Sequence, residues 1–186
     1  MCEMPTEQIA LADTRRWLER AVVGLNLCPF AKSVMVKHQV HFVVTNAGDA
    51  GEALDAFERE LDALVAADAA SRDTTLLVIP NGMHDFLSFL DLAARAERIV
   101  RKRGLDGVIQ VAHFHPDFVF AGAEDGDITN YTNHAPYPTL HLLREQSIDR
   151  AVAAFPDAAA IYEADMVALR RLGRVGWDAL GVGATH

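Results

Sequence analysis

The sequence predicts a single α/β domain with a small, mostly parallel sheet of three to five strands and helices on both faces. Strand-like and helix-like segments alternate along the chain, as they do when parallel strands are joined by helical crossovers. The run from Thr74 to Ile79 is short and largely apolar, which is typical of a strand buried on both faces. A length of 186 residues fits one domain.

Apolar spacing predicts three strands, at residues 38–45, 74–79 and 108–114. The alternation of Val40, Phe42 and Val44 marks the first of them. A further strand is expected at residues 33–37, at residues 118–121 or in the C-terminal tail. The competing architecture is an α+β split β-α-β (ferredoxin-like) arrangement, in which one strand runs antiparallel to the others.

Helical spacing and capping signals predict the remaining elements. The first helix ends at Cys28, because Pro29 disfavours helical backbone at the residue before it. Asp49 with Glu52 resembles a capping box. The expected helices cover residues 11–28, 49–64, 86–104, 139–145, 147–155 and 157–172. The globular domain spans residues 1–186, and the Gly-rich residues 175–186 are expected to form a flexible tail.

The composition argues against several classes of partner and compartment. A formal net charge of −9 opposes nucleic-acid binding, because polyanions are held mainly by Lys and Arg. The longest apolar runs are far shorter than the roughly 20 residues that span a bilayer, so no membrane segment is expected. Acidic residues near the N-terminus, Glu3, Glu7 and Asp13, argue against an export signal and favour the cytoplasm. The oligomeric state is left open.

Polar side chains gather where the predicted strands end. Asn81 follows the second strand, and His113 and His115 close the third. Ligands of parallel sheets bind beyond the carboxyl ends of the strands, so these residues are expected at one edge of the sheet. Period-two alternation places both histidines on one face, with His115 at the rim and His113 deeper among apolar neighbours.

A long polar loop covers residues 117–138, which exceeds the usual length of an unstructured connection and favours a functional loop. Within it, Asn130 and Tyr137 are candidates for orienting a ligand. In the short helix expected next, His141 and Arg144 are three positions apart and share a face. Arg144 is either a clamp for a carboxylate or phosphate, or the ion-pair partner of a neighbouring acid.

Three kinds of chemistry are compatible with these residues. His113 and His115 have a spacing that metal sites use, with His84, Asp117 or His141 as a further ligand, although such a pair is also typical of a packed strand end. Cys28 is either a nucleophile or a small core residue, and the end of a helix does not lower the pKa of a thiol. His115 or His141 can serve as general acid or base.

Three stretches of the sequence resemble the bacterial and plant family called domain of unknown function 1415. They are GLNLCPFAK at residues 24–32, VIQVA with FHPD between residues 108 and 117, and DITNYTN with PYPTLHLLRE between residues 127 and 145. The resemblance covers about residues 17–171 and implies no established activity, substrate or cofactor. It implies that the family keeps the positions of Cys28, His115, Asn130, Pro136, Tyr137, His141 and Arg144. His113 departs from the family pattern, which weakens a metal site built on both histidines.

Together these features favour a small cytoplasmic enzyme, of hydrolase or transferase type, that acts on an anionic small molecule at the ends of the strands. The residues expected to do chemistry are His115, His141 and Cys28, and those expected to bind the ligand are Arg144, Asn130, Tyr137 and Asn81. One alternative is a non-catalytic module that binds a metabolite or a protein. Another is a metal-binding protein that uses His115 with His113 or His141. No cofactor is assigned.

Overall fold

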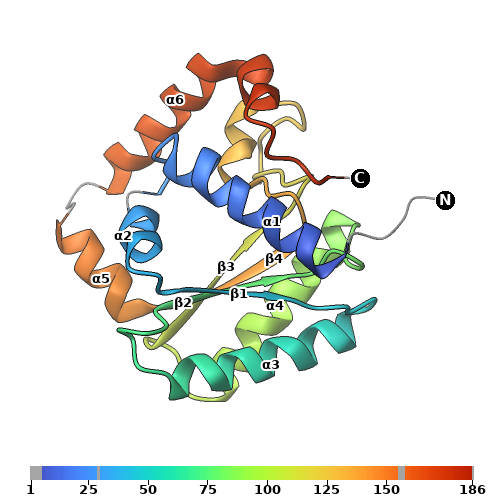
Figure 1. The fold of residues 1–186 in the computed structure, drawn as a ribbon, viewed down its shortest axis with the longest axis vertical. Coiled ribbons are helices and arrows are strands. Elements are labelled where there is room, and N and C mark those ends of the chain that lie inside the picture. Colours follow the sequence, from blue (N-terminus) through green and yellow to red (C-terminus); the bar gives the residue numbers. More distant parts are fainter. Residues whose placement is uncertain (1–5, 29, 155–157, 186) are drawn as a thin grey trace.

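A four-stranded sheet lies between two layers of helices (Figure 1). The computed structural model describes residues 6–28, 30–154 and 158–185. The strands are β1 (Val40–Val44), β2 (Thr74–Val78), β3 (Ile109–Phe114) and β4 (Thr139–Arg144). The helices are α1 (Glu7–Trp17), α2 (Ala31–Val36), α3 (Ala50–Ala66), α4 (Phe86–Lys102), α5 (Glu145–Ala154) and α6 (Ala158–Ala179), with a π-helical segment η1 (Leu18–Val23) and a 3-10 segment η2 (Ile128–Asn133).

The sheet is mixed, with the strand order β1-β2-β4-β3. β1 and β2 are parallel, and β4 is antiparallel to both β2 and β3, so β3 points the same way as β1 and β2. The predicted α/β class is confirmed, whereas the expectation of a mostly parallel sheet is met only in part. The alternative with one antiparallel strand describes the strand directions better, because β4 splits the unit formed by β2, α4 and β3.

The stretch from Thr139 to Arg144 is a central strand, so the prediction of a helix there is wrong. Leu140 and Leu142 are fully buried, and they fill the core between the sheet and α3 and α4. A strand between two partners forms hydrogen bonds on both sides, and this tertiary gain outweighs the local helical spacing. In a strand, residues three apart lie on opposite faces, so His141 and Arg144 do not share one.

The other elements follow the local signals more closely. The Asp49 side chain caps α3 by accepting a hydrogen bond from the Glu52 N–H at 2.9 Å.

The expectation of a further strand at residues 33–37 or 118–121 is wrong. Residues 33–37 lie in α2 and at its end. Residues 118–121 belong to a loop. The expected start of the last helix, at residue 157, lies outside the described residues.

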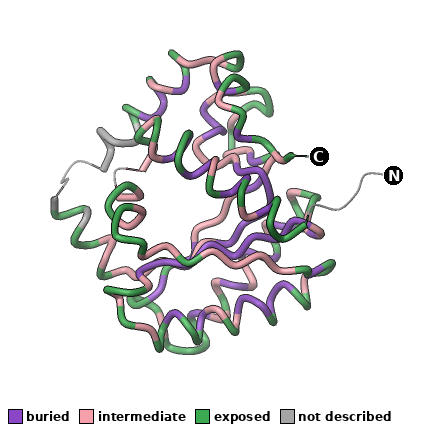
Figure 2. The backbone as a smooth tube through the Cα atoms, viewed as in Figure 1, coloured by how far each residue is buried: buried purple, intermediate pink, exposed green. Residues whose placement is uncertain are grey.

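The two largest apolar clusters lie on the two faces of the sheet, and the buried segments follow the strands and the inner sides of the helices (Figure 2). On one face, α3 and α4 pack onto β2, β3 and β4 through side chains that include Phe57 and Phe89. On the other face, α1 packs onto β1 and β2, and residues of η1 and α6 join Trp17 and Leu76 in one apolar cluster. Which face a strand residue occupies therefore decides which side chains it can meet.

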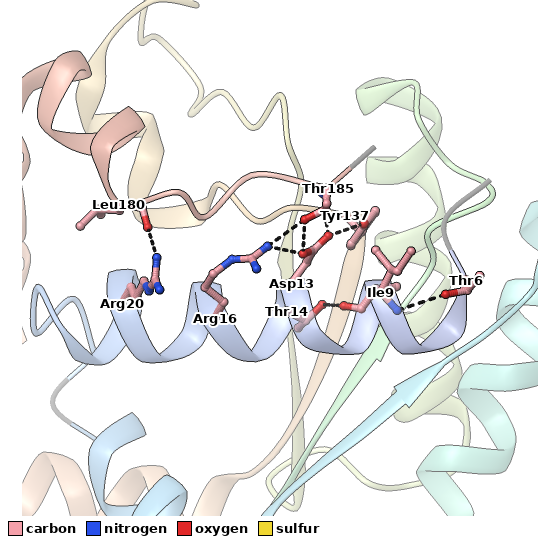
Figure 3. Close-up of polar contacts among 10 residues, drawn as sticks. Thr6, Ile9, Asp13, Thr14, Arg16, Arg20, Tyr137, Leu180 and Thr185 are labelled. Carbon is pink, nitrogen blue, oxygen red and sulfur yellow. Dashed lines mark hydrogen bonds and ion pairs between the residues drawn. The ribbon is translucent and has the colours of Figure 1, made fainter. Parts of the chain in front are cut away.

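The end of the chain is attached to α1 through Asp13 (Figure 3). The buried Asp13 carboxylate accepts hydrogen bonds from the Tyr137 hydroxyl at 2.8 Å and from the Thr185 N–H and hydroxyl at 2.7 Å each, and it pairs with Arg16. Burial by itself raises the pKa of Asp13, but these hydrogen bonds and the Arg16 charge together lower it overall. The predicted flexible tail thus includes a stretch that is bonded to α1 as far as Thr185.

Candidate functional site

His115 and His141 lie on opposite faces of the sheet. The His115 ring packs against Phe86 and Phe89 of α4, with ring centroids 5.3 and 5.1 Å apart. The His141 ring contacts Phe114 on the other face, at a centroid distance of 6.0 Å. The sequence-based expectation that both imidazoles belong to one site is therefore wrong, because the sheet separates them.

His115 bridges two loops and uses both of its ring nitrogens to do so. Its side chain is fully buried. The Asp117 N–H donates to Nδ1 at 3.0 Å, and Nε2 lies 3.0 Å from the Met83 carbonyl oxygen. Because an N–H only donates and a carbonyl only accepts, Nδ1 is the acceptor and Nε2 carries the proton. Burial lowers the pKa of His115, in the same direction as this neutral form. His115 is thus a buried link between the loops after β2 and β3, whereas strand alternation predicted it at the rim, with His113 deeper.

The donor atoms near His115 are poorly suited to a metal ion. Both nitrogens of His115 are engaged with the backbone. His113 packs against Phe89 and Phe118, and its buried Nδ1 has no hydrogen-bond partner within the described residues. Throughout residues 6–28, 30–154 and 158–185, no group of three or more His, Cys, Asp or Glu side chains could hold an ion. The geometry therefore does not support the metal-binding alternative based on His115.

Asn130 and Tyr137 stabilise the polar loop from inside the protein. The buried Asn130 accepts a hydrogen bond from the Phe120 N–H at 3.1 Å and donates one to the Glu124 carbonyl at 2.8 Å. The Tyr137 hydroxyl donates to Asp13, and its pKa is raised by burial first and by this hydrogen bond second. These bonds account for both residues within the fold, and contact with a ligand stays a prediction for each.

Arg144 closes the C-terminal end of α3. Its Nη2 donates to the carbonyl oxygens of Leu64 and Ala67 at 2.6 and 2.7 Å, and its Nε and Nη2 reach the Arg72 carbonyl at 3.4 Å. Carbonyls in the last turn of a helix lack partners within the helix, and a cation there also complements the helix dipole. Much of the guanidinium is therefore occupied by backbone, and its use as an anion clamp stays a prediction.

An open cleft follows the sheet edge at which the sequence predicted a ligand. Its volume is about 1300 Å³, and its lining includes Asn81, Asp117 and Tyr137. The Asn81 Oδ1 atom is buried and has no hydrogen-bond partner among the described residues. Met83 beside it has a φ of 60°, a left-handed conformation that is uncommon outside glycine. The cleft thus collects two of the predicted ligand-binding residues.

A second hollow, here called the inner cavity, lies between the sheet and the segments η1, α2 and α5. Its volume of about 710 Å³ is within the range of small-molecule pockets. Most of its lining is apolar, with contributions from Trp17, Val22, Leu76, Ala112, Phe114 and Leu143. Two of the predicted catalytic residues, Cys28 and His141, also line it, and Arg144 borders it. The inner cavity therefore brings together Cys28, His141 and Arg144, which lie far apart along the chain.

His141 is the main polar group on the sheet side of the inner cavity. Its Nε2 lies 2.5 Å from the Thr74 hydroxyl oxygen on the neighbouring strand β2. Burial lowers the pKa of His141 to about 4. The imidazole is therefore neutral near pH 7 and can donate one hydrogen bond and accept another.

Cys28 precedes α2, and does not end a helix as the sequence predicted, because η1 ends at Val23 and the chain turns before Cys28. Burial raises the pKa of its thiol, while the N–H groups of Phe30 and Ala31 act in the opposite direction. Sequence reasoning missed Asp165, a buried carboxyl on α6 whose charge also raises the pKa of Cys28. The pKa of Asp165 is itself raised to about 6 by burial.

The fold and the cavity define an α/β protein with a mainly apolar cavity on one face of a mixed sheet. The chain matches the family described as "Protein of unknown function (DUF1415)" over residues 9–179, and it belongs to that family. This confirms the resemblance of the three sequence stretches. No curated protein and no solved structure matches the chain. Within the described residues, no helix is long and apolar enough to cross a membrane, and a cytoplasmic location stays a prediction.

Proposed function

We propose that this protein binds a small molecule with an apolar body and an anionic group in the inner cavity. The observation that carries the proposal is the cavity itself, a mainly apolar space of about 710 Å³ with the hydrogen-bonded pair of His141 and Thr74 on its sheet side. Ligand pockets typically combine mostly apolar walls with a few polar groups that orient the ligand. The three sequence stretches that carry the family resemblance all contribute to its lining, through residues such as Cys28, Ala112 and His141.

The charges at the cavity favour an anion over a cation. Lys37 and Arg150 line the cavity and are exposed to solvent, so both lie on its solvent side. The acid among the lining residues, Asp73, is buried and accepts a hydrogen bond from the Ser147 hydroxyl at 2.6 Å. A carboxylate between Lys37 and Arg150 would remain partly hydrated while the apolar body enters the cavity.

A matched pair of ligands tests the charge preference. Phenylpropionate and phenylpropylamine have the same apolar body and opposite charges. We expect phenylpropionate to raise the melting temperature and to slow the reaction of Cys28 with N-ethylmaleimide in a Cys2→Ser background, because Cys28 lines the cavity. Phenylpropylamine should do neither. Equal effects of the two ligands, or none from either, contradict the proposal.

A matched pair of substitutions tests the location. Ala112→Phe adds a large side chain inside the inner cavity, and Ala121→Phe adds the same group to the open cleft. Phenylpropionate binding should be lost in the first variant and kept in the second. Lys37→Glu, at an exposed position, is a further variant that preserves packing and should weaken binding several-fold. The opposite pattern assigns the ligand to the open cleft.

Catalysis on the bound molecule is the second candidate, because Cys28 and His141 line one cavity. In acyl transfer, the Cys28 sulfur would bond to the acyl carbon, the leaving alcohol would take the thiol proton, and water would hydrolyse the thioester. The raised pKa of Cys28 opposes this chemistry in the ligand-free protein. A phenylpropionyl ester whose hydrolysis disappears in Cys28→Ala and leaves an acyl group on Cys28 by mass spectrometry in the parent would support it. Unchanged hydrolysis in Cys28→Ala contradicts it.

A further inference from the structure

The Thr74 hydroxyl makes two short hydrogen bonds, and its role as donor or acceptor is fixed in each. Its oxygen lies 2.7 Å from the Leu142 carbonyl oxygen and 2.5 Å from the His141 Nε2. A hydroxyl has one proton, and a carbonyl oxygen can only accept. The Thr74 proton is therefore used at Leu142, and the second contact requires His141 to donate from Nε2. Thr74 is buried on a central strand, so its rotamer is held by packing.

We infer that Thr74 fixes His141 in the tautomer with its proton on Nε2, so that Nδ1 is the acceptor for a hydrogen-bond donor on the bound molecule. A neutral imidazole has one N–H, which leaves the other nitrogen as an acceptor. Thr74 is then a positioning residue that acts through His141. The inference rests on the proposed function, because it names a feature of the ligand that the inner cavity takes.

The tautomer selects among ligands of similar shape. A molecule that carries an O–H or N–H near His141 satisfies the Nδ1 lone pair on binding. A molecule with only an ether or carbonyl oxygen at that point meets another acceptor, and both lone pairs lose their water without replacement. The ligand class is therefore an apolar-bodied anion with a hydrogen-bond donor at its inner end, such as a hydroxyaryl or hydroxyalkyl carboxylate.

The tautomer of His141 can be determined by NMR in the ligand-free protein. The ¹⁵N chemical shifts of the His141 ring should report a protonated Nε2 and a bare Nδ1 near pH 7. Thr74→Ser keeps the hydroxyl and should keep this pattern, whereas Thr74→Val removes the hydroxyl at similar volume and should produce a mixture of tautomers. A protonated Nδ1 in the parent protein, or an unchanged pattern in Thr74→Val, overturns the inference.

Three ligands test the donor preference. We expect para-hydroxyphenylpropionate to bind about three- to tenfold more tightly than para-methoxyphenylpropionate, with phenylpropionate between them. The advantage should persist in Thr74→Ser and shrink in Thr74→Val. Equal affinity for the hydroxy and methoxy compounds overturns the inference while leaving the proposed function intact. Failure of all three to bind overturns the proposed function, and the ¹⁵N shifts then still decide the tautomer.

Discussion

The two histidines that the sequence placed in one site have opposite surroundings. His115 is fully buried behind the open cleft, with both ring nitrogens bonded to backbone. His141 lines the inner cavity, and its Nε2 is bonded to a side chain on the next strand. Burial lowers the pKa of both. The difference teaches that a perturbed, buried histidine indicates function only where a ring nitrogen remains available beside a space that a ligand can enter.

The strongest test of this comparison is the stability of His115→Ala. The substitution leaves a hole beside Phe86 and Phe89 and removes the partners of Met83 and Asp117. We expect the free energy of unfolding to fall by about 2–4 kcal/mol, measured by urea denaturation. His84→Ala, at an exposed position in the same region, should change it by no more than about 0.5 kcal/mol. A near-neutral His115→Ala would falsify the bridging role.

The next test concerns the hydrogen bonds by which Asp13 of α1 holds Tyr137 and Thr185. Asp13→Ala removes the acceptor of Tyr137 and Thr185, so we expect a loss of about 2–3 kcal/mol. Asp178→Ala removes an exposed pair with Arg174 and should cost about 0–1 kcal/mol.

The Asp13 contribution should also depend on pH. Its pKa is lowered in the folded protein, so its stabilisation is fully present above the unfolded pKa of about 3.9 and is lost as the pH falls through the lower folded value. The parent protein should therefore lose more stability than Asp13→Ala when urea denaturation is repeated below pH 4. Parallel losses in the two proteins would show that this carboxylate is not specifically stabilised.

The smallest expected effect is the contribution of His141 to the loss of folding stability at low pH. A histidine whose pKa falls from 6.5 to about 4 on folding binds fewer protons when folded, so stability decreases as the pH drops from about 6.5 toward 4. Between pH 7 and pH 4.5, the parent should lose about 1–3 kcal/mol more than His141→Gln.

The comparison with His141→Gln isolates the contribution of His141 to the pH dependence of stability, because the other groups with shifted pKa values are present in both proteins. The pKa values of His113, His115 and His134 are also lowered, and that of Asp165 is raised. Their contributions cancel in the difference between the two pH profiles. Identical slopes for the parent and the variant would mean that His141 is not desolvated in the folded protein.

Much of the fold was predictable because its signals are local. The cap at Asp49, the alternation in β1 and the apolar run of β2 each reflect a few consecutive residues. The segment containing His141 was mispredicted because its leucines fit a helix and a strand almost equally. Only its position between β2 and β3 favours the strand, and no local propensity encodes that position.

The sequence by itself determined the α/β class, the family, the order of most elements and the identity of several polar residues with structural or candidate functional roles. Only the tertiary structure decided which of these polar residues lie next to one another. Because residues 139–144 form a strand and not the predicted helix, His141 lies on the face opposite His115. There it contacts Thr74 and lines the same cavity as Cys28. The physical reason is that a side chain in a sheet faces one side or the other, and the choice depends on strand pairing between residues distant in the chain.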